Sequence, residues 1–411
     1  MNLGYFISRR IYKKGGYGRH ISSPILKIAV GAVALGMVVM LVAVSTGLGL
    51  QKTIQSNVAA FSGHVQIMAM DTNESYSSAP ISIAQDFYPQ FTSVPQVKHI
   101  QVFATRPGIL LKTDDEFEGV VLKGVSSDYL WDNFRSFIKS GSIPGFGIHE
   151  DAGDSIIVSQ KTADALEADI GDRVKMYFVR DSGKPIMRYF TIAATFKTGI
   201  PDFDDNYAIG SLDMLQNINQ WTPDMVGGFE VILENTSQLP EATRKIYLET
   251  GWELGISSIA STHAALLDWV AMFDVNIAVI LGIMIIVCGV NMITVLLILI
   301  LEKTSLIGLL KSLGASNHLV RKVFLWNAFY IILRGLFWGN LIALALLFAQ
   351  KYTGFVTLDS STYSVDTVPV YLDVWVILTL NAGAAFINMT MLIVPSYFIS
   401  RIKPAETLKY E

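Results

Sequence analysis

The sequence predicts an integral membrane α-helical protein with four transmembrane helices and a large α+β extracytoplasmic domain between helices 1 and 2. Two observations predict this class. Of the 411 residues, 51% are hydrophobic and only 16% are charged, whereas soluble globular proteins carry about 25% charged residues. In addition, the chain contains four long apolar runs, and each exceeds the about 20 helical residues that span a bilayer core.

The first of these runs is expected to be a retained membrane anchor. Its 23 uncharged residues exceed the about 7–15 residues of a signal-peptide core, and no convincing small-residue cleavage site follows. Arg334 is the only charged residue inside any run. The four runs are residues 28–50, 275–301, 323–350 and 374–400.

Lysine and arginine predict the orientation of the chain. They are concentrated before the first run, between the second and third runs, and after the fourth, whereas the loop 351–373 contains only Lys351. Cytoplasmic loops are enriched in these residues, so we expect both termini in the cytoplasm. The segment 51–268 then lies on the far side of the membrane.

The predicted organisation follows from these spans. Its parts are a cytoplasmic N-terminal basic segment (1–27), transmembrane helix 1 (28–50), the extracytoplasmic α+β domain (51–268), a stalk with transmembrane helix 2 (269–301), a cytoplasmic loop with a short helix (302–322), transmembrane helix 3 (323–350), a short loop on the far side (351–373), transmembrane helix 4 (374–400) and a cytoplasmic tail (401–411).

The extracytoplasmic segment has the pattern of an α+β domain, either as one domain or as two lobes. Start and stop signals predict a helix from Ser159 through 170, one after Ser211, and one with Pro240 in its first turn that ends at Gly251. Alternation of apolar residues predicts strands at 64–68, 119–125, 154–159, 174–179, 189–196 and 229–233. The stretch 180–188 lies between two of these strands and is expected to be a hairpin tip.

The sequence contains no catalytic, metal-binding or phosphate-binding pattern. Acidic clusters at 114–118 and 202–205 lack the spacing of a calcium loop, and we expect both to be solvated faces. The six histidines are scattered and Cys288 is the single cysteine. The chain has no GxxxxGK[ST] loop and no basic stripe suited to nucleic acid. We therefore expect no directly bound cofactor, metal or nucleic acid.

The second membrane helix is expected to begin outside the membrane. Its helical pattern starts near Thr262 and continues to Lys303, which gives about 60 Å at about 1.5 Å per residue. This is about twice the thickness of the bilayer core, so part of the helix would form a stalk that can carry motion. The alternative is a break within 268–274 and a separate amphipathic helix.

The cytoplasmic loop 302–322 predicts a short amphipathic helix. Its residues Leu306, Ile307, Leu310 and Leu313 share one helix face. Thr304 or Ser305 is expected to cap its start, and Gly314 its end. Such a helix either lies on the lipid surface or docks into a groove of a soluble partner.

Several segments resemble a known family. The loop 302–316, with EKTSLIGLLKSLGAS, resembles the coupling helix of FtsX-like permeases, the membrane subunits of type VII ABC transporters. The segments 45–51 (STGLGLQ), 196–205 (FKTGIPDFDD) and 363–373 (YSVDTVPVYLD), with the C-terminal tail from 394 onwards, are similar to lipoprotein-releasing (Lol-type) permeases. The coupling-helix pattern and the tail recur across the MacB-like superfamily, whereas 196–205 and 363–373 favour the lipoprotein branch.

The resemblance implies a non-catalytic subunit of the cell inner membrane, with its large domain in the periplasm. A cytoplasmic ABC ATPase would use ATP-Mg, and a second permease copy or a paralogue would complete the membrane part. The complex would extract lipoproteins from the outer leaflet of the inner membrane by mechanotransmission. The implied ATPase-coupling residues are Glu302, Lys303, Leu306, Ile307, Leu310, Lys311 and Gly314.

The same resemblance places the entry path of the lipoprotein between the first and second spans. Acyl chains leave the bilayer at a cost of about 0.8 kcal/mol per CH₂, so the path should be apolar. Alternatively, the side chains there contact membrane lipid or pack between helices. The implied acyl-chain path consists of Val39, Met40, Val44, Leu48, Met272, Phe273, Ile277 and Ile280.

Three features depart from the family pattern. The third span keeps Gly335 and Gly339 of a glycine pattern, but Ala328 and Ile332 replace two other glycines. Arg334 lies inside that span, where an Arg costs about 2.5–3.5 kcal/mol, so we expect it to face protein or water. The turn with Arg180, Lys184 and Pro185 is a possible contact for a periplasmic lipoprotein chaperone, but it is shorter than the hook of one Lol permease type.

Two other functions fit the same architecture. One is a MacB-like exporter of periplasmic drugs or peptides, and the other is an FtsX-like regulator of cell-wall hydrolases. The regulator usually has a much smaller outer domain than 51–268. A membrane enzyme is a weaker alternative, because no nucleophile–base pattern is present.

Overall fold

The computed structural model describes residues 22–70, 76–113, 116–147, 153–178, 185–358 and 365–397. They divide into two compact units. The membrane unit contains the described residues up to Leu50, 271–356 and those from Val368 onwards, and the outer unit contains 51–270 and 357–367. Residues 1–21 and 398–411, with Arg180 and Lys184 of the predicted turn and Asp114 and Asp115 of the acidic cluster, lie outside the described residues.

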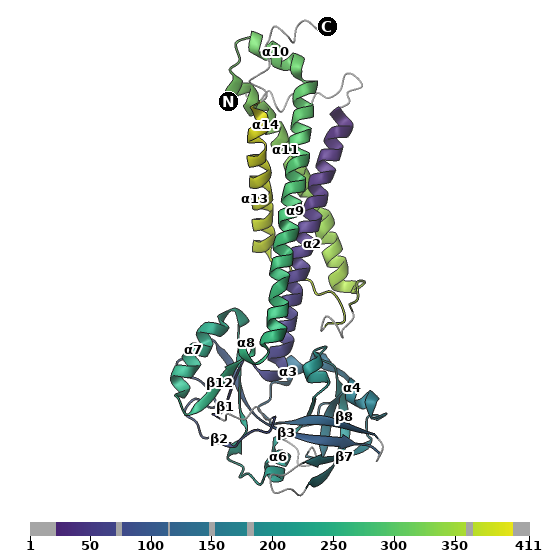
Figure 1. Ribbon diagram of the computed structural model, residues 1–411, viewed down its shortest axis with the longest axis vertical. Helices are drawn as coiled ribbons and strands as arrows, with labels where there is room; N and C mark the ends of the chain where they lie inside the picture. The colour runs from purple at the N-terminus through teal and green to yellow at the C-terminus, as the bar shows by residue number, and fades with distance from the viewer. Residues whose placement is uncertain are drawn as a thin grey trace. The chain divides into compact units, whose positions relative to one another are not determined.

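Four helices of the described chain are long and apolar enough to cross a membrane, as predicted. They are α2 (Ser22–Ser62), α9 (Ala264–Glu302), α11 (Asn317–Thr353) and α13 (Val374–Met391), shown in Figure 1. The fourth predicted span, 374–400, is helical in its described residues as far as Ser396, with one interruption at Leu392. The helix ends at Met391 because Pro395 cannot donate a hydrogen bond and its ring clashes with the carbonyl four residues earlier. The short α14 (Ile393–Ser396) follows.

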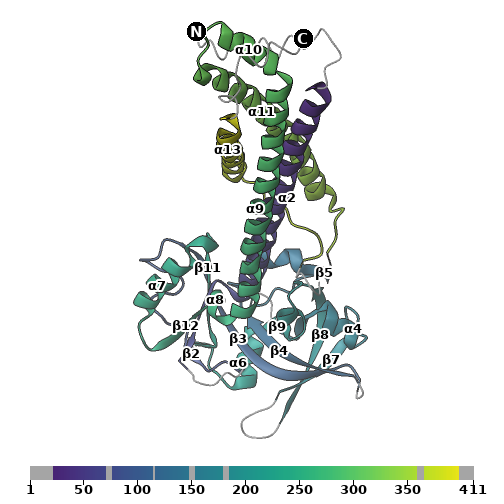
Figure 2. The same ribbon diagram turned by 45° about the horizontal axis from the view of Figure 1, so that its top comes forward.

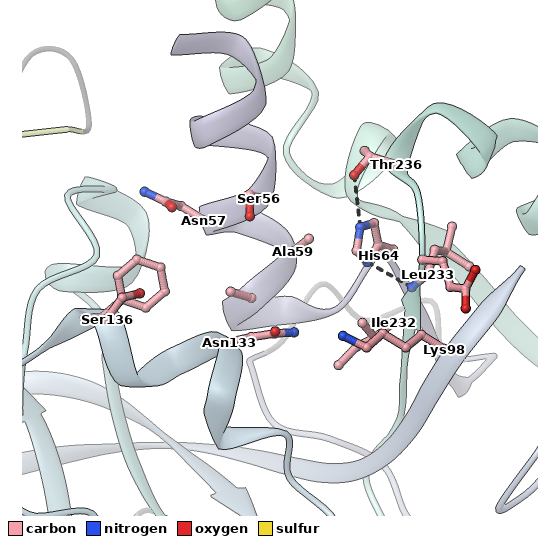
Figure 3. Close-up of a pocket in the computed structure, with 13 residues that line it drawn as sticks. Ser56, Asn57, Ala59, His64, Lys98, Asn133, Ser136, Ile232, Leu233 and Thr236 are labelled. Carbon is pink, nitrogen blue, oxygen red and sulfur yellow. Dashed lines mark hydrogen bonds between the residues drawn. The ribbon is translucent and has the colours of Figure 1, made fainter. Parts of the chain in front are cut away.

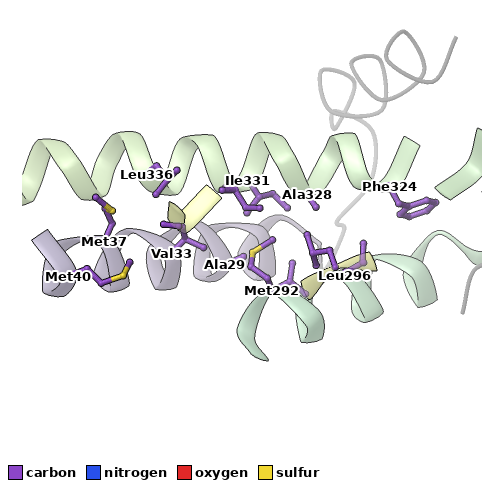
Figure 4. Packing of buried hydrophobic residues seen from close by; sticks show 14 of the residues in the cluster. Ala29, Val33, Met37, Met40, Met292, Leu296, Phe324, Ala328, Ile331 and Leu336 are labelled. Carbon is purple, nitrogen blue, oxygen red and sulfur yellow. The ribbon is translucent and has the colours of Figure 1, made fainter. Parts of the chain in front are cut away.

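The helices of the membrane unit pack around one hydrophobic core, to which α2, α9 and α11 contribute most of the buried side chains (Figure 4). Glycines bring two of them together. A Cβ atom added at Gly335 would lie 2.6 Å from the Val33 side chain, and one at Gly339 would lie 2.7 Å from the Ala34 carbonyl oxygen. Small residues allow membrane helices to approach closely, so the two glycines set the contact between α11 and α2.

Polar side chains also join the membrane helices. Asn340 of α11 and Asn381 of α13 exchange two amide hydrogen bonds of 2.6 and 3.0 Å. Reciprocal bonding satisfies both amides away from water. Arg334 lies on an exposed face of α11 in this single chain, so the expectation that it faces protein or water stays a prediction.

The outer unit is built on a mixed sheet that closes on itself. Ten strands follow the order β12-β1-β11-β3-β4-β9-β6-β8-β5, and β7 pairs with both β3 and β8 (Figure 2). The strands β3, β4, β9, β6, β8 and β7 therefore form a closed circuit. The strands are β1 Val65–Ala69, β2 Ile81–Ser82, β3 Val97–Leu111, β4 Phe117–Val125, β5 Ile138–Gly141, β6 Ser155–Ser159, β7 Arg173–Phe178, β8 Ile186–Phe196, β9 Tyr207–Ser211, β10 Met225–Val226, β11 Gly228–Leu233 and β12 Leu254–Ser258.

One long strand makes the two halves of this sheet a single structure. β3 pairs with β11 through Phe103 and with β4 from Phe103 onwards. Its far end also pairs with β7, where a Cβ atom at Gly108 would lie 2.9 Å from the Tyr177 carbonyl oxygen. A glycine in a strand permits this close backbone approach. The alternative of two lobes is thus resolved as two halves that share β3.

The short helices of the outer unit partly match the predictions. α7 (Leu239–Thr250) has Pro240 in its first turn and Gly251 as its C-cap, and α6 (Leu212–Asn219) follows Ser211, as expected. α4 (Gln160–Ala165) begins after Ser159 but ends earlier than the predicted residue 170. The remaining helical segments are α3 Trp131–Phe134, η1 Arg135–Phe137, α5 Pro201–Asp204, η3 Thr236–Gln238 and α8 Ile259–Thr262.

All six predicted strands are present, within a few residues of their expected ends. The sequence did not predict β3, whose Arg106, Pro107 and Gly108 interrupt the apolar pattern. It also missed β9, which is only five residues long. Short or interrupted strands are recognised mainly by their neighbours in the sheet.

Two helices run without interruption through the residues at which the chain divides into units. α2 continues twelve residues beyond Leu50 to Ser62, and α9 contains no break between Asp268 and Asp274. The alternative of a break within 268–274, with a separate amphipathic helix, is therefore wrong. One residue separates α8 from α9, which begins at Ala264, close to the predicted start near Thr262.

We expect Gly339→Leu to destabilise the membrane unit, because the new side chain would meet α2 at backbone distance. Overpacking of this kind costs about 1–3 kcal/mol. The thermal unfolding midpoint of the purified chain in detergent measures the effect. Gly383→Leu on α13 is the control, because nothing lies within 4 Å of a Cβ atom added there. Equal midpoints for the two variants would contradict the proposed packing.

Candidate functional site

The predicted coupling helix is present as α10, Thr304–Ser312. Its end follows the prediction: Gly314 has φ of +86°, its N–H donates to Lys311, and Ala315 N–H donates to Leu310. This is a Schellman motif, which favours glycine. The predicted cap at the start of the helix, by Thr304 or Ser305, is wrong. Thr304 Oγ1 instead donates to the Leu301 carbonyl at 2.6 Å, because α10 follows α9 after a single residue.

The apolar face that was predicted to dock packs on the protein's own core in this single chain. Ile307 is completely buried, and Leu310 packs against the same cluster. Ile307 is therefore not available to a partner in this structure, whereas Leu310 is half-buried. The exposed apolar side chains are instead Leu309 and Leu313, at 49% and 77% exposure.

The other predicted coupling residues lie at the edges of α10. Lys303 Nζ is 3.1 Å from the Glu302 carboxylate at the junction of α9 and α10. Leu306 and Lys311 are half-buried. The face that remains open to a partner contains Ser305, Leu309, Ser312 and Leu313.

The predicted acyl-chain path is closed in this structure. Met40 and Val44 are buried, at 4% and 6% exposure, whereas Met272 is 62% exposed. Helices α2 and α9 touch, since a Cβ atom added at Gly47 would lie 2.5 Å from Ile277. The structure therefore does not bring the predicted residues into one accessible surface. Val39, Leu48, Phe273, Ile277 and Ile280 are half-buried.

In the outer unit, the segment 196–205 forms a hydrogen-bonded turn in which Asp204 is buried, while Asp202 is exposed as expected. Asp204 accepts hydrogen bonds from Thr198 N, at 2.8 Å, and from Gly199 N, at 2.9 Å. Burial raises the pKa of Asp204, and these bonds oppose that rise. The expectation that this cluster is solvated is wrong for Asp204, because a short carboxylate can hydrogen-bond its own backbone turn.

This turn contacts the ends of two helices. The ring of Phe203 stacks on Phe61, with 4.3 Å between centroids, and Phe61 lies in the last turn of α2. His263, between α8 and α9, packs edge-on against Phe203 and lies 4.0 Å from Asp202. The segment 196–205 therefore contacts the end of α2 through Phe61 and the residue before α9, His263.

The same turn contacts the segment that connects α11 and α13. Lys197 Nζ is 2.9 Å from one oxygen of Asp366, and Lys139 Nζ is 3.3 Å from the other. Asp366 belongs to the family-like segment 363–373. Two segments that resemble the lipoprotein branch therefore meet within the outer unit.

The third family-like segment, 45–51, contacts the connection between α11 and α13 within the membrane unit. Tyr371 N–H donates to the Ser45 carbonyl at 3.0 Å. A Cβ atom at Gly49 would lie 2.5 Å from the Pro369 carbonyl oxygen, so glycine is required for this approach. The segments 45–51 and 363–373, far apart in sequence, are therefore neighbours.

A buried ion pair fixes the end of α2 to the sheet, and the sequence analysis did not identify it. Lys123 Nζ of β4 is 2.6 Å from Glu230 of β11, and the two side chains are 2% and 0% exposed. The ammonium also donates to the Phe61 carbonyl, one of the last four helix carbonyls, which lack helical partners. A cation is favoured there by the helix dipole.

The surroundings of the pair satisfy its remaining bonds. Gln101 donates to the second Glu230 oxygen at 2.9 Å, and the Lys123 ammonium lies 4.8 Å from the Phe61 ring centroid. Burial lowers the pKa of Lys123, while Glu230 opposes this shift. The available signal was one charged residue inside each of two otherwise apolar predicted strands, 119–125 and 229–233.

A polar cavity of about 270 Å³ lies beside the end of α2 (Figure 3). His64 is fixed at its wall: Nε2 lies 3.1 Å from Thr236 Oγ1, and Nδ1 accepts from Leu233 N–H at 3.2 Å. Burial lowers the pKa of His64 to about 4, so the ring is neutral near pH 7 and serves structure. Lys98 and Glu234 are the charged residues of the lining. In the part of the chain that the structure describes, no three metal-ligating side chains are grouped.

Comparison with known proteins gives two family matches. Residues 28–246 match the MacB-like periplasmic core domain, and residues 278–404 match the FtsX-like permease C-terminal region. The chain is similar to lipoprotein-releasing system transmembrane protein LolE of Haemophilus influenzae, with 22% identity over 99% of each chain. It is also similar to LolC of Neisseria meningitidis, with 23% identity over 98% of this chain and 97% of that one.

Solved structures give weaker similarity. The periplasmic region of MacB from Actinobacillus actinomycetemcomitans has a TM-score of 0.33 and 13% identity, covering 49% of this chain and 91% of that one. The extracellular domain of the transporter YknZ from Gram-positive bacteria has a TM-score of 0.32 and 16% identity, covering 47% of this chain and 99% of that one.

We expect Lys123→Met to destabilise the outer unit by about 3–5 kcal/mol, because Glu230 would remain buried without its cation. The double variant Lys123→Met/Glu230→Gln removes both charges and should recover much of this loss. Thermal unfolding of the three purified proteins, with hydrogen exchange of peptides from 51–62, measures the effect. A double variant no more stable than the single one would show that the ion pair does not anchor α2.

Proposed function

Because the chain belongs to the MacB-like periplasmic core domain family and continues into an FtsX-like permease region, we propose that it is the permease subunit of an ATP-driven ABC transporter for lipoproteins. The complex extracts lipoproteins from the outer leaflet of the inner membrane and releases them towards the outer membrane. The observation that carries the proposal is the similarity to lipoprotein-releasing transmembrane proteins over nearly the whole chain. Both termini are cytoplasmic, and the outer unit is periplasmic.

The membrane unit receives its motion from a cytoplasmic ABC ATPase that hydrolyses ATP-Mg. The open face of α10, with Leu309 and Leu313, docks into a cleft of this ATPase, in the manner of an amphipathic helix in a groove. The opposite face supports the proposal, since Ile307 and Leu310 join α10 to the core. A displacement of α10 therefore displaces α9 and α11.

The motion reaches the periplasm along continuous helices. α9 has no break between Asp268 and Asp274, and α2 ends at the buried pair of Lys123 and Glu230. A helix without a kink transmits axial displacement over its length. A second permease copy or a paralogue completes the transporter, and a periplasmic chaperone is a further expected partner.

Entry of the acyl chains requires α2 and α9 to separate. In the described state the helices touch at Gly47 and Ile277. Because each CH₂ costs about 0.8 kcal/mol outside an apolar environment, the opened surfaces must shield the chains. We expect Met40 and Val44 to become accessible on opening, in addition to Met272, which is already exposed.

The match to the MacB-like core domain keeps one alternative in view, an exporter of periplasmic drugs or peptides. The two functions differ in the substrate and not in the mechanics. An exporter would move soluble periplasmic molecules and would not release lipid-anchored proteins.

The proposed function is tested by reconstituting the chain in proteoliposomes with its ATPase, a partner permease where the pair is mixed, a triacylated lipoprotein and an acceptor chaperone. We expect lipoprotein to leave the vesicles only with ATP-Mg. The matched control is the same protein without its lipid anchor, added on the periplasmic side. Transport of the unlipidated protein, together with retention of the lipoprotein, would favour the exporter.

The two faces of α10 predict opposite outcomes for two aspartate variants. Leu309→Asp places a charge on the open face, so we expect the ATPase to be lost while the chain stays folded. Burial of a leucine is worth about 1.5–3 kcal/mol, enough to reduce co-purification strongly. Ile307→Asp places a charge in the core and should instead lower the unfolding midpoint of the chain alone. Full recovery of the ATPase with Leu309→Asp would refute docking through this face.

A further inference from the structure

The connection between α11 and α13 forms a short two-stranded ribbon in its described residues. Thr357 and Thr367 make an antiparallel bridge, and Leu358 N–H donates to the Asp366 carbonyl at 3.0 Å. The bridge places Asp366 on the ribbon at a defined position, and not on an irregular loop.

The base of the ribbon is fixed by one buried side chain. Gln350, near the end of α11, is 6% exposed. Its amide nitrogen donates to the carbonyls of Val356, at 3.0 Å, and Val368, at 3.1 Å, and its oxygen accepts from Val356 N–H at 2.9 Å. Both strands are therefore tied to α11, and beyond them Tyr371 is bonded to Ser45 of α2.

The distal contact of the ribbon is an ion-pair cluster within the outer unit. Lys139 of β5 and Lys197, next to β8, hold the two oxygens of Asp366. Hydrogen bonding to Lys197, assisted by Lys139, lowers the pKa of Asp366, so the carboxylate is charged near pH 7. The three side chains are 36–51% exposed, so salt screens the cluster and it can be broken at low cost.

We propose that the ribbon formed by 356–358 and 365–368 is a strut, a third mechanical connection besides α2 and α9. It carries displacements of α11 and α13 to the outer unit through Asp366. The base is rigid because Gln350 bonds both strands, and the distal contact is releasable because it consists of exposed charges. This inference rests on the proposed function for its effect on transport, whereas the contact itself can be tested without transport.

The test reverses charges in the cluster of the full-length protein in its complex. Asp366→Lys should increase hydrogen exchange in the peptides that contain 136–141 and 354–358. It should also lower the lipoprotein released per ATP hydrolysed, by about two- to thirty-fold if coupling is modulated as in other networks. The variant Lys139→Asp/Lys197→Asp/Asp366→Lys restores opposite charges and should restore both readouts.

A matched control breaks another exposed ion pair of the outer unit. Lys245 and Glu241 of α7 are 2.7 Å apart and 38% and 63% exposed, so Glu241→Lys should leave both readouts unchanged. The unfolding midpoint of each variant establishes that it is folded.

The strut is overturned if Asp366→Lys behaves as the wild type, or if the triple variant, while folded, fails to recover. A wild-type complex that hydrolyses ATP but releases no lipoprotein would refute the proposed function instead. In that case the difference in hydrogen exchange between wild type and Asp366→Lys still tests the strut. If there is no difference, the strut is overturned as well.

Discussion

The outer unit depends on how the first membrane helix ends inside it. The last carbonyls of α2 would be unsatisfied, and the ammonium of Lys123 takes up that of Phe61 while it is paired with Glu230. The pair lies between β4 and β11, on opposite sides of β3, so one interaction holds the helix to both halves of the sheet. Burying two charges is favourable only when their hydrogen bonds are complete, and here Gln101 completes them. The aromatic stack of Phe61 and Phe203 then joins the same helix end to the turn 196–205.

Within the membrane unit, α2 is again the helix that the other elements contact, and glycines permit these contacts. Gly335 and Gly339 bring α11 onto α2, Gly47 admits Ile277 of α9, and Gly49 admits Pro369. Contacts of this kind are close because no side chain intervenes, and they are governed by packing, since lipid offers no hydrophobic drive for helix association. A seam held by packing can open when the helices are displaced. This suits the proposed passage of acyl chains between α2 and α9.

The connections between the units differ in strength in a way that fits their proposed roles. α2 ends in a buried, fully bonded ion pair, and α9 is an unbroken helix. The ribbon formed by 356–358 and 365–368 instead contacts the outer unit through exposed charges. This difference would allow the ribbon to release its contact while α2 and α9 stay attached to the outer unit. α10 likewise combines a buried contact with an exposed one: Ile307 lies in the core, and Leu309 is open to a partner.

The sequence by itself determined the four spans, the outer α+β domain, and six of its strands, because bilayer thickness and strand alternation are local constraints. It also singled out 45–51, 196–205 and 363–373, although it could not predict that they meet. Helical periodicity placed Ile307 and Leu310 on one face of α10, but only tertiary packing decided that this face is buried. The pair of Lys123 and Glu230 was invisible for the same reason: its partners are 107 residues apart. Periodicity specifies which side chains share a face, whereas what covers that face depends on contacts that only the folded chain creates.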